Sequence, residues 1–158
     1  MIAEWRSSPD FHGRCNLLIQ ESKADLDKRY NNLGPEEKWF LVEKKDGTKI
    51  GMIVLEWVGG VQEIGYGILP SERKKGYCTE AVRLIVDYLF LSKDIARIQA
   101  HTDTRNTASQ KVLESVGFGK EGRVRKHIFM WGEWRDEFLY SILREEWKES
   151  KMLTRTTR

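Results

Sequence analysis

Residues 65–81 read Gly-Tyr-Gly-Ile-Leu-Pro-Ser-Glu-Arg-Lys-Lys-Gly-Tyr-Cys-Thr-Glu-Ala, the pattern of a strand end, a cationic turn with one glycine, and the first turn of a helix. Such a junction gathers the unpaired N–H groups of a helix N-terminus and the positive end of its dipole. Arg73, Lys74 and Lys75 add positive charge at the same place. The combination predicts a binding site for an anion such as a phosphate.

Two common phosphate loops do not fit this stretch. The P-loop requires a glycine followed by Lys and Ser or Thr, whereas Gly76 is followed by Tyr77 and Cys78. The dinucleotide-binding fingerprint fails because Pro70 stands where its third glycine belongs. The remaining motif is Arg73-x-x-Gly76-x-Cys78, after a predicted strand and before a predicted helix.

Composition limits the class of protein. The 158 residues are enough for one domain, and a net charge of +3 is too small to indicate a nucleic-acid partner. Cys15 and Cys78 cannot build a disulfide framework and lack the clustered histidines of a metal site, so we expect a cytoplasmic protein with no metal. No apolar run reaches the length of a membrane span, and the N-terminus lacks the apolar core of a signal peptide.

The remaining pattern predicts an α+β order of elements. Asp46-Gly47 and Gly59-Gly60 are turn signals between apolar runs and predict an antiparallel meander of three strands. Thr79 is expected to cap the helix that follows the cationic turn. The predicted strands are 39–43, taken as buried, 50–57, 61–69, 95–102, 124–131 and 134–143, with helices over 22–32, 79–90 and 106–116 and a loop over 118–122.

The motif Arg73-x-x-Gly76-x-Cys78 resembles the pyrophosphate loop of the GNAT acyl-CoA-dependent N-acetyltransferases, Arg/Gln-x-x-Gly-x-Gly/Ala. Cys78 departs from the last position but is small. A second segment, Asn106-x-x-Ser109 followed by Gly117-Phe118, is similar to another GNAT motif, and Asp136 with residues 140–143 resembles the RimJ/RimL-type branch. The resemblance covers about residues 39–147, with its motifs in the family's order and spacing.

This resemblance implies a GNAT acyl-CoA N-acyltransferase fold over one domain, residues 1–148, with a basic tail at 149–158 that we expect to be disordered. The implied sheet is mixed and splays apart between its two middle strands, 61–69 and 95–102. Relative to the family, the usual first strand is missing from the expected order. The edge of the sheet that this strand would otherwise cover would be covered by a homodimer or by the segment before residue 20.

The resemblance also implies acetyl-CoA as cosubstrate. The cationic loop would hold the pyrophosphate, unpaired backbone groups at the end of strand 61–69 would bind the pantetheine arm, and Asn106 would either bind that arm or only cap its helix. The predicted coenzyme contacts are Ile68, Leu69, Arg73, Lys74, Lys75, Gly76, Tyr77, Cys78, Thr79 and Asn106.

The implied reaction is direct attack of an amine on the thioester, which needs no covalent enzyme nucleophile and leaves Cys15 and Cys78 as packing residues. Glu63 is expected to be the general base, with a pKa raised by burial, unless it is an exposed strand carboxylate. His127 or a water relay are the alternatives. Ser109 is expected to stabilise the leaving thiolate, unless it only packs its helix.

The RimJ/RimL resemblance implies a protein N-terminal amine, of the ribosomal-protein type, as acceptor. A small amine such as a polyamine or an antibiotic, and a non-catalytic acyl-CoA-binding module, remain alternatives. Acceptor pockets in this family are made by variable loops, here expected at residues 10–35 and 120–135. Trp131 and Trp134 would line that pocket, or would pack the hairpin or a dimer contact.

Overall fold

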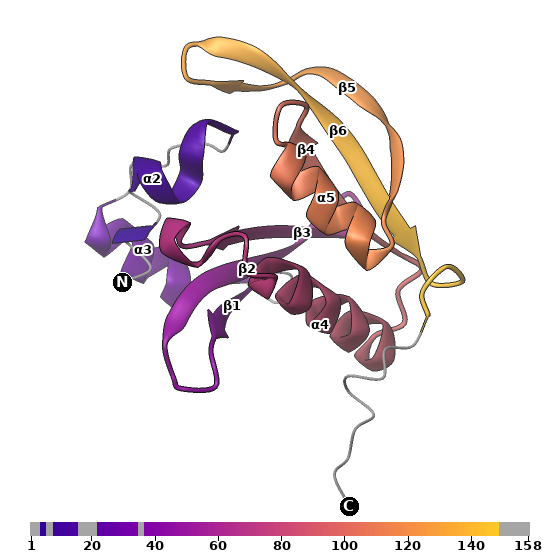
Figure 1. Ribbon diagram of the computed structural model, residues 1–158, viewed down its shortest axis with the longest axis horizontal. Coiled ribbons are helices and arrows are strands. Elements are labelled where there is room, and N and C mark those ends of the chain that lie inside the picture. Colours follow the sequence, from indigo (N-terminus) through magenta and orange to yellow (C-terminus); the bar gives the residue numbers. More distant parts are fainter. Residues whose placement is uncertain (1–3, 6–7, 16–21, 35–36, 149–158) are drawn as a thin grey trace, which may run out of the picture.

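A computed structural model describes residues 4–5, 8–15, 22–34 and 37–148 of the chain. The tail predicted at 149–158, and parts of the loop predicted at 10–35, lie outside these described residues. The architecture is α+β, as predicted, with six strands in one mixed sheet in the order β1-β2-β3-β4-β6-β5 (Figure 1). Among the described residues, no helix is both long enough and apolar enough to cross a membrane.

The elements follow the chain in an order close to the predicted one. They are α2 (Pro9–His12), the 3-10 helix η1 (Gly13–Cys15), α3 (Lys23–Asn31), β1 (Lys38–Glu43), β2 (Lys49–Val58), β3 (Val61–Ile68), the 3-10 helix η2 (Pro70–Glu72), α4 (Tyr77–Ser92), β4 (Arg97–Asp103), α5 (Thr107–Val116), β5 (Gly119–Met130) and β6 (Glu133–Leu143).

The first three strands form the predicted antiparallel meander. Gly47 and Gly60 both have a φ of 85°, the left-handed conformation that tight turns require and that glycine adopts without strain. Gly51 serves a different need, because a Cβ at this position would lie 2.4 Å from the backbone oxygen of Gly67 on β3. In the described part of the chain β1 is one of the two edge strands of the sheet, and Leu41 within it is 40% exposed, so the prediction of a buried strand there was wrong.

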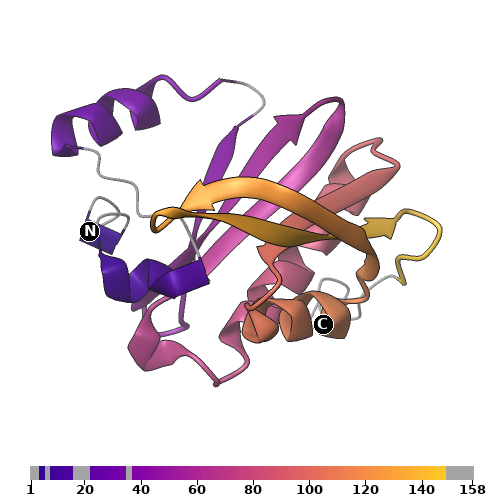
Figure 2. The same cartoon turned by 90° about the horizontal axis from the view of Figure 1, so that it is seen from above.

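The predicted splay lies between β3 and β4. These parallel strands pair only at Gln62 with Ile98 and at Glu63 with Gln99, and then separate. Figure 1 shows β4, β6 and β5 curving away from the β1–β3 meander. In Figure 2 the β5–β6 hairpin crosses over the meander with its tip toward α2. The sheet therefore has two halves that are joined along a short seam.

One apolar core holds the two halves together. Val82 and Leu89 of α4, Ile98 of β4, Leu113 of α5 and Tyr140 of β6 each have 0% of their surface exposed. α4 and α5 pack beside each other, and the Arg83 guanidinium donates a hydrogen bond to the Ser115 carbonyl across their contact. Burial of these side chains across the seam compensates for the few hydrogen bonds between β3 and β4.

Two predicted boundaries were wrong. α4 begins at Tyr77 after Gly76, whose φ is 85°, so Thr79 lies inside the first turn and does not cap the helix. The loop predicted at 118–122 is largely strand, since β5 begins at Gly119 and Lys120 pairs with Tyr140 of β6. The start of α4 is set by the left-handed conformation of Gly76, and the start of β5 by pairing with β6, a tertiary contact that overrides the local preference for a loop.

Candidate active site

The splay between β3 and β4 opens into a cleft of about 510 Å³. α2 and η1 form one wall, and the N-terminal ends of α4 and α5 form the other. Most residues predicted to contact the coenzyme are brought together here. Of the predicted coenzyme contacts, Leu69 and Lys75 do not line the cleft, and those that do are Ile68, Arg73, Lys74, Gly76, Tyr77, Cys78, Thr79 and Asn106. Of the two predicted catalytic residues, Ser109 lines the cleft and Glu63 does not.

The cationic loop has the backbone geometry of an anion site. Lys74 and Gly76 have φ values of 62° and 85°, and no side chain caps the N-terminus of α4. A helix start without a cap leaves N–H donors available, and the positive end of the dipole of a 16-residue helix lies at the same place. Apart from Gly76 and its chain neighbours, no atom of the described residues lies within 4 Å of the Cβ position at Gly76, so a phosphate can approach this backbone closely. The loop therefore fits the pyrophosphate of acetyl-CoA.

Arg73 lines the cleft and also has a structural role. Its guanidinium donates to the carbonyl oxygens of Ile68 at 3.0 Å, Asp10 at 3.1 Å and Phe11 at 2.6 Å. The side chain thus joins the end of β3 and the loop to α2. Lys75 pairs with Glu72 at 3.2 Å and does not line the cleft, so of the three cationic side chains of the loop only Arg73 and Lys74 line it.

The backbone groups expected to bind pantetheine are partly in use. The Leu69 N–H donates to the Ile50 carbonyl at 2.8 Å, and the Leu69 carbonyl accepts from the Glu72 N–H at 2.9 Å. The Ile68 carbonyl accepts the hydrogen bond from Arg73. The expectation of unpaired groups was therefore wrong for these three, because the turn into η2 closes on itself and on β2.

A hydroxyl pair crosses the cleft wall between β3 and α5. The Tyr66 hydroxyl lies 2.8 Å from the Ser109 hydroxyl, and the Ser109 N–H donates to the Asn106 side chain at 3.1 Å as the cap of α5. Burial raises the pKa of Tyr66. Tyr66 was not predicted. It lies two residues from Ile64 and two from Ile68, which line the same cleft, and because side chains two apart on a strand share a face, this pattern could have identified it.

Glu63 does not line the cleft, and its pKa is shifted down from the ordinary value, whereas an upward shift was expected. Burial favours the neutral carboxyl, but hydrogen bonds from His101 and Gln99 outweigh burial and lower the pKa of Glu63 below its ordinary value. The Glu63 carboxylate lies 3.2 Å from His101 Nδ1 and accepts from Gln99 Nε2 at 2.9 Å. His101, a residue that was not predicted, lines the cleft.

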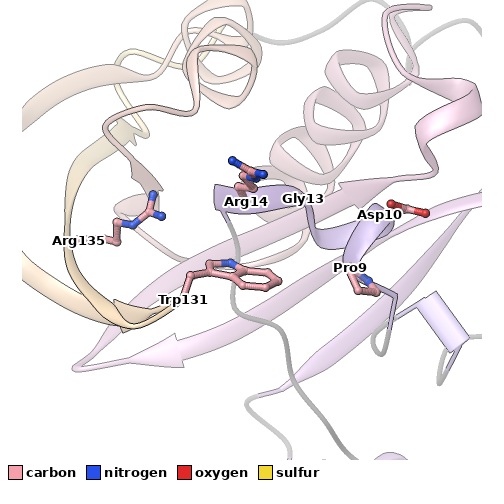
Figure 3. A pocket seen from close by; sticks show the side chains of 6 residues that line it. All are labelled: Pro9, Asp10, Gly13, Arg14, Trp131 and Arg135. Atoms are coloured by element: carbon pink, nitrogen blue, oxygen red, sulfur yellow. The ribbon is translucent and has the colours of Figure 1, made fainter.

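A second pocket of about 540 Å³ adjoins the cleft at Gly13 and Arg14, which line both (Figure 3). Its other lining residues are Pro9, Asp10, Trp131 and Arg135. The pocket lies between α2 and the β5–β6 hairpin, where acceptor loops were predicted. Trp131 lines this pocket, which agrees with the alternative that places it in a pocket of this region.

Trp134 instead packs within the β5–β6 hairpin, the other alternative considered for the two tryptophans. It lies outside the lining of the second pocket and contacts Phe129 edge to face within the hairpin, with 5.6 Å between the ring centroids. Arg135 was not predicted; it is buried and held by Asp103 at 3.1 Å and Glu133 at 2.7 Å.

Comparisons with known proteins agree with this geometry. The family model of the acetyltransferase (GNAT) domain matches residues 1–119. The probable N-acetyltransferase YjcK of Bacillus subtilis (strain 168) is 43% identical over 134 residues, covering 82% of this chain and 70% of that protein. Ribosomal-protein-S5-alanine acetyltransferase from Vibrio fischeri superposes with a TM-score of 0.75 at 25% identity, covering 93% of this chain and 88% of that chain.

A further structure is that of spermidine N-acetyltransferase from Vibrio cholerae in complex with CoA and spermine. It superposes with a TM-score of 0.81 at 22% identity, covering 92% of this chain and 89% of that chain, and so shows a shared fold. The splayed sheet, the uncapped helix behind a glycine loop, and the match of the family model lead to one conclusion. The chain belongs to the GNAT family of acetyl-CoA-dependent N-acetyltransferases.

Proposed function

We propose that this enzyme transfers the acetyl group of acetyl-CoA to the N-terminal amine of a protein, in the manner of the RimJ/RimL-type branch. The observation that carries the proposal is the junction of two spaces, a cleft with an anion-binding helix start and a second pocket that meets it at Gly13 and Arg14. One space suits the coenzyme and the other suits the acceptor. An acceptor of the ribosomal-protein type implies that the reaction takes place in the cytoplasm.

The reaction proceeds by direct attack in a ternary complex. The backbone of the loop around Gly76 and Lys74 holds the pyrophosphate, and the cleft along Ile68 and Asn106 holds the pantetheine arm. The neutral amine attacks the thioester carbonyl, a C–N bond forms, and the C–S bond breaks. Ser109, hydrogen-bonded to Tyr66, stabilises the leaving thiolate, and a base on the side of the cleft where Glu63 and His101 pair accepts the amine proton.

The charges of the second pocket favour a peptide N-terminus over a polyamine. Its charged lining consists of two guanidinium side chains, Arg14 and Arg135, and one carboxylate, Asp10. A polyamine carries several positive charges and needs carboxylates along its length, because like charges repel at short range. A peptide presents one amine followed by carbonyl oxygens, which are acceptors for guanidinium donors.

The test measures release of the free CoA thiol with acetyl-CoA and three groups of acceptors. These are peptides that begin with small residues, spermidine with spermine, and amine antibiotics. We expect thiol release with the peptides, and mass spectrometry should place the acetyl group on the α-amine. A matched peptide with a blocked N-terminus and a free internal lysine is the control and should release no thiol.

Three other results would contradict the proposal. Faster turnover with spermidine than with any peptide would assign the enzyme to polyamines, and faster turnover with antibiotics would assign it to those amines. If no acceptor releases thiol while calorimetry measures CoA binding, the chain is an acyl-CoA-binding module.

A further inference from the structure

Two carboxylate–imidazole pairs stack on each other where β3, β4, β5 and β6 come together. Glu63 pairs with His101 at 3.2 Å, and His127 pairs with Glu137 at 2.6 Å between Nδ1 and Oε2. The two imidazole rings lie 4.6 Å apart between centroids, with 28° between their planes. The cluster is not explained by packing alone, because four titratable side chains are held in one place.

The first pair fixes one orientation of the His101 ring. Glu63 is held by two donors, and its lowered pKa keeps it ionised near neutral pH. An ionised carboxylate 3.2 Å from Nδ1 holds the ring proton on that nitrogen, which leaves the lone pair of a neutral ring on Nε2. His101 lines the cleft, whereas Glu63 stands behind it.

The surroundings of His101 come from four strands. Glu63 on β3 and Gln99 on β4 lie on one side, and His127 on β5 and Glu137 on β6 lie on the other. The His101 side chain is 18% exposed, so its ring reaches the cleft but is mostly shielded from water. Hydrogen bonding to Glu63 raises the pKa of His101, which burial opposes and the charges of Glu63 and Glu137 support.

We propose that His101 is the catalytic base that accepts the proton of the acceptor amine, and that Glu63 is a positioning residue that acts through it. One proton moves from the ammonium nitrogen to Nε2 of His101, and the freed lone pair of the amine forms the C–N bond. The second proton of the attacking nitrogen passes to the CoA sulfur as the C–S bond breaks, so the products are a neutral amide, the CoA thiol and protonated His101. The electron pair of the broken C–S bond leaves with the CoA sulfur. The inference rests on the proposed transferase function and names the residue that performs its proton transfer.

Imidazole suits this step better than the carboxylate does. An α-amine has a pKa of about 8, and a base works best when its own pKa lies near that of the donor and near the working pH. Glu63 has moved away from that range and His101 toward it. The pair therefore divides the work, with one side chain accepting the proton and the other orienting the ring.

The test is the pH profile of kcat at saturating acetyl-CoA and peptide, for wild type, His101→Gln, Glu63→Gln and Glu63→Asp. Wild type should lose activity as pH falls through an apparent pKa above 6.5, because protonated His101 is not a base. His101→Gln should lower kcat about 100-fold near pH 7, with a rising limb that moves up to the pKa of the amine, about 8. The deficit should shrink toward pH 9, where the amine is neutral without help.

Glu63→Gln should move the limb in the opposite direction. Loss of the carboxylate lowers the pKa of His101, so the limb should shift to lower pH while the maximal kcat falls. Glu63→Asp, which keeps the charge, should restore part of that maximum. The chain has three histidines, so proton NMR of wild type and of single His→Gln variants assigns each ring, and the pKa of His101 should fall in Glu63→Gln. CoA affinity measured by calorimetry checks that each variant is folded.

Two outcomes would overturn the assignment. A His101→Gln enzyme with wild-type kcat near pH 7 excludes His101 as the base. A limb that moves to higher pH in Glu63→Gln, as in His101→Gln, makes Glu63 the base itself. Both require an active wild type, so they are distinct from failure of the proposed function, in which wild type acetylates no amine and both proposals fall together.

Discussion

At the scale of single residues, burial keeps the thiol of Cys78, which lines the cleft, in its protonated form. Burial raises the pKa of Cys78 to about 12, so at neutral pH the side chain is a thiol and not a nucleophilic thiolate. The geometry agrees with direct transfer, in which the enzyme forms no covalent intermediate. The departure of Cys78 from the small residue of the family motif is then explained by packing, because Cys78 lies in the first turn of α4 and packs against the core.

Replacement of Cys78 by alanine should therefore leave kcat within about twofold of wild type, a change of less than 1 kcal/mol in the activation barrier. Steady-state kinetics with an active acceptor measures it. Cys15→Ala is the matched control, since burial also raises the pKa of that thiol. A loss of activity confined to Cys78→Ala, in a variant that still binds CoA, would indicate a covalent role.

The hydroxyl pair makes a second prediction at this scale. Ser109→Ala should lower kcat by about 100-fold if Ser109 stabilises the leaving thiolate, with CoA affinity unchanged. Tyr66→Phe should have a smaller effect because the Ser109 hydroxyl remains, and the backbone of Ser109 is held at the start of α5 by the Asn106 cap, which accepts from the Ser109 N–H. If Ser109→Ala turns over as fast as wild type, Ser109 does not stabilise the thiolate and its role is packing of α5.

At the scale of elements, the role of the loop around Gly76 in CoA binding can be tested separately from the backbone strain that a substitution of Gly76 introduces. Gly76 and Gly47 have the same φ of 85° and open space at the Cβ position, but Gly47 lies in the β1–β2 turn. Valine at either position should destabilise the fold by about 1–2 kcal/mol, as expected for an L residue in the left-handed region. Only Gly76→Val should weaken CoA binding, by tenfold or more, because its side chain occupies the approach to the loop. Equal CoA affinity in the two variants would remove the loop from its proposed role.

The same unit shows how far the sequence predicts elements. Apolar alternation and turn signals located the meander, and the Gly117 closure located the end of α5, whose C-cap has a φ of 111°. The start of α4 was missed because Gly76 begins the helix by its conformation and not by a side-chain cap. The start of β5 was missed because only pairing with β6 makes Gly119 and Lys120 a strand.

At the scale of the whole molecule, the sequence predicted the splayed sheet but not the contacts across it. Glu63 and His101 meet because β3 and β4 pair at only two positions, and His127 reaches them because the long hairpin curves back over the sheet. Likewise, Arg14 and Arg135 are 121 positions apart in sequence and face one pocket. Local patterns carry no information on registers of this kind.

The Glu63–His101 pair also links global stability to pH. The pKa of Glu63 is lowered from 4.5, so its contribution is present above that pH and is lost as pH falls through the folded value. The pKa of His101 is raised from 6.5, so its contribution is complete below 6.5 and is lost as pH rises through the folded value. The pair therefore stabilises most between pH 4.5 and 6.5.

Glu63→Gln should accordingly lower the free energy of unfolding more at pH 5.5 than at pH 8.5, as measured by urea denaturation at both values. His127→Gln, which leaves the Glu63–His101 pair intact, is the comparison variant. A difference between wild type and Glu63→Gln that does not change with pH would show that the pair makes no ionic contribution.

The three hydrogen bonds of Arg73 connect the walls of the cleft and of the second pocket. Its guanidinium holds the loop to the carbonyls of Asp10 and Phe11, and Asp10 also lines the second pocket, which we propose for the acceptor. A coenzyme that orders the loop therefore orders the wall that the acceptor meets. By thermodynamic reciprocity, each substrate then changes the affinity of the other by the same factor. Acetyl-CoA should consequently raise the affinity for the acceptor amine, and Arg73→Ala should weaken this coupling, which calorimetry of each substrate with and without the other measures.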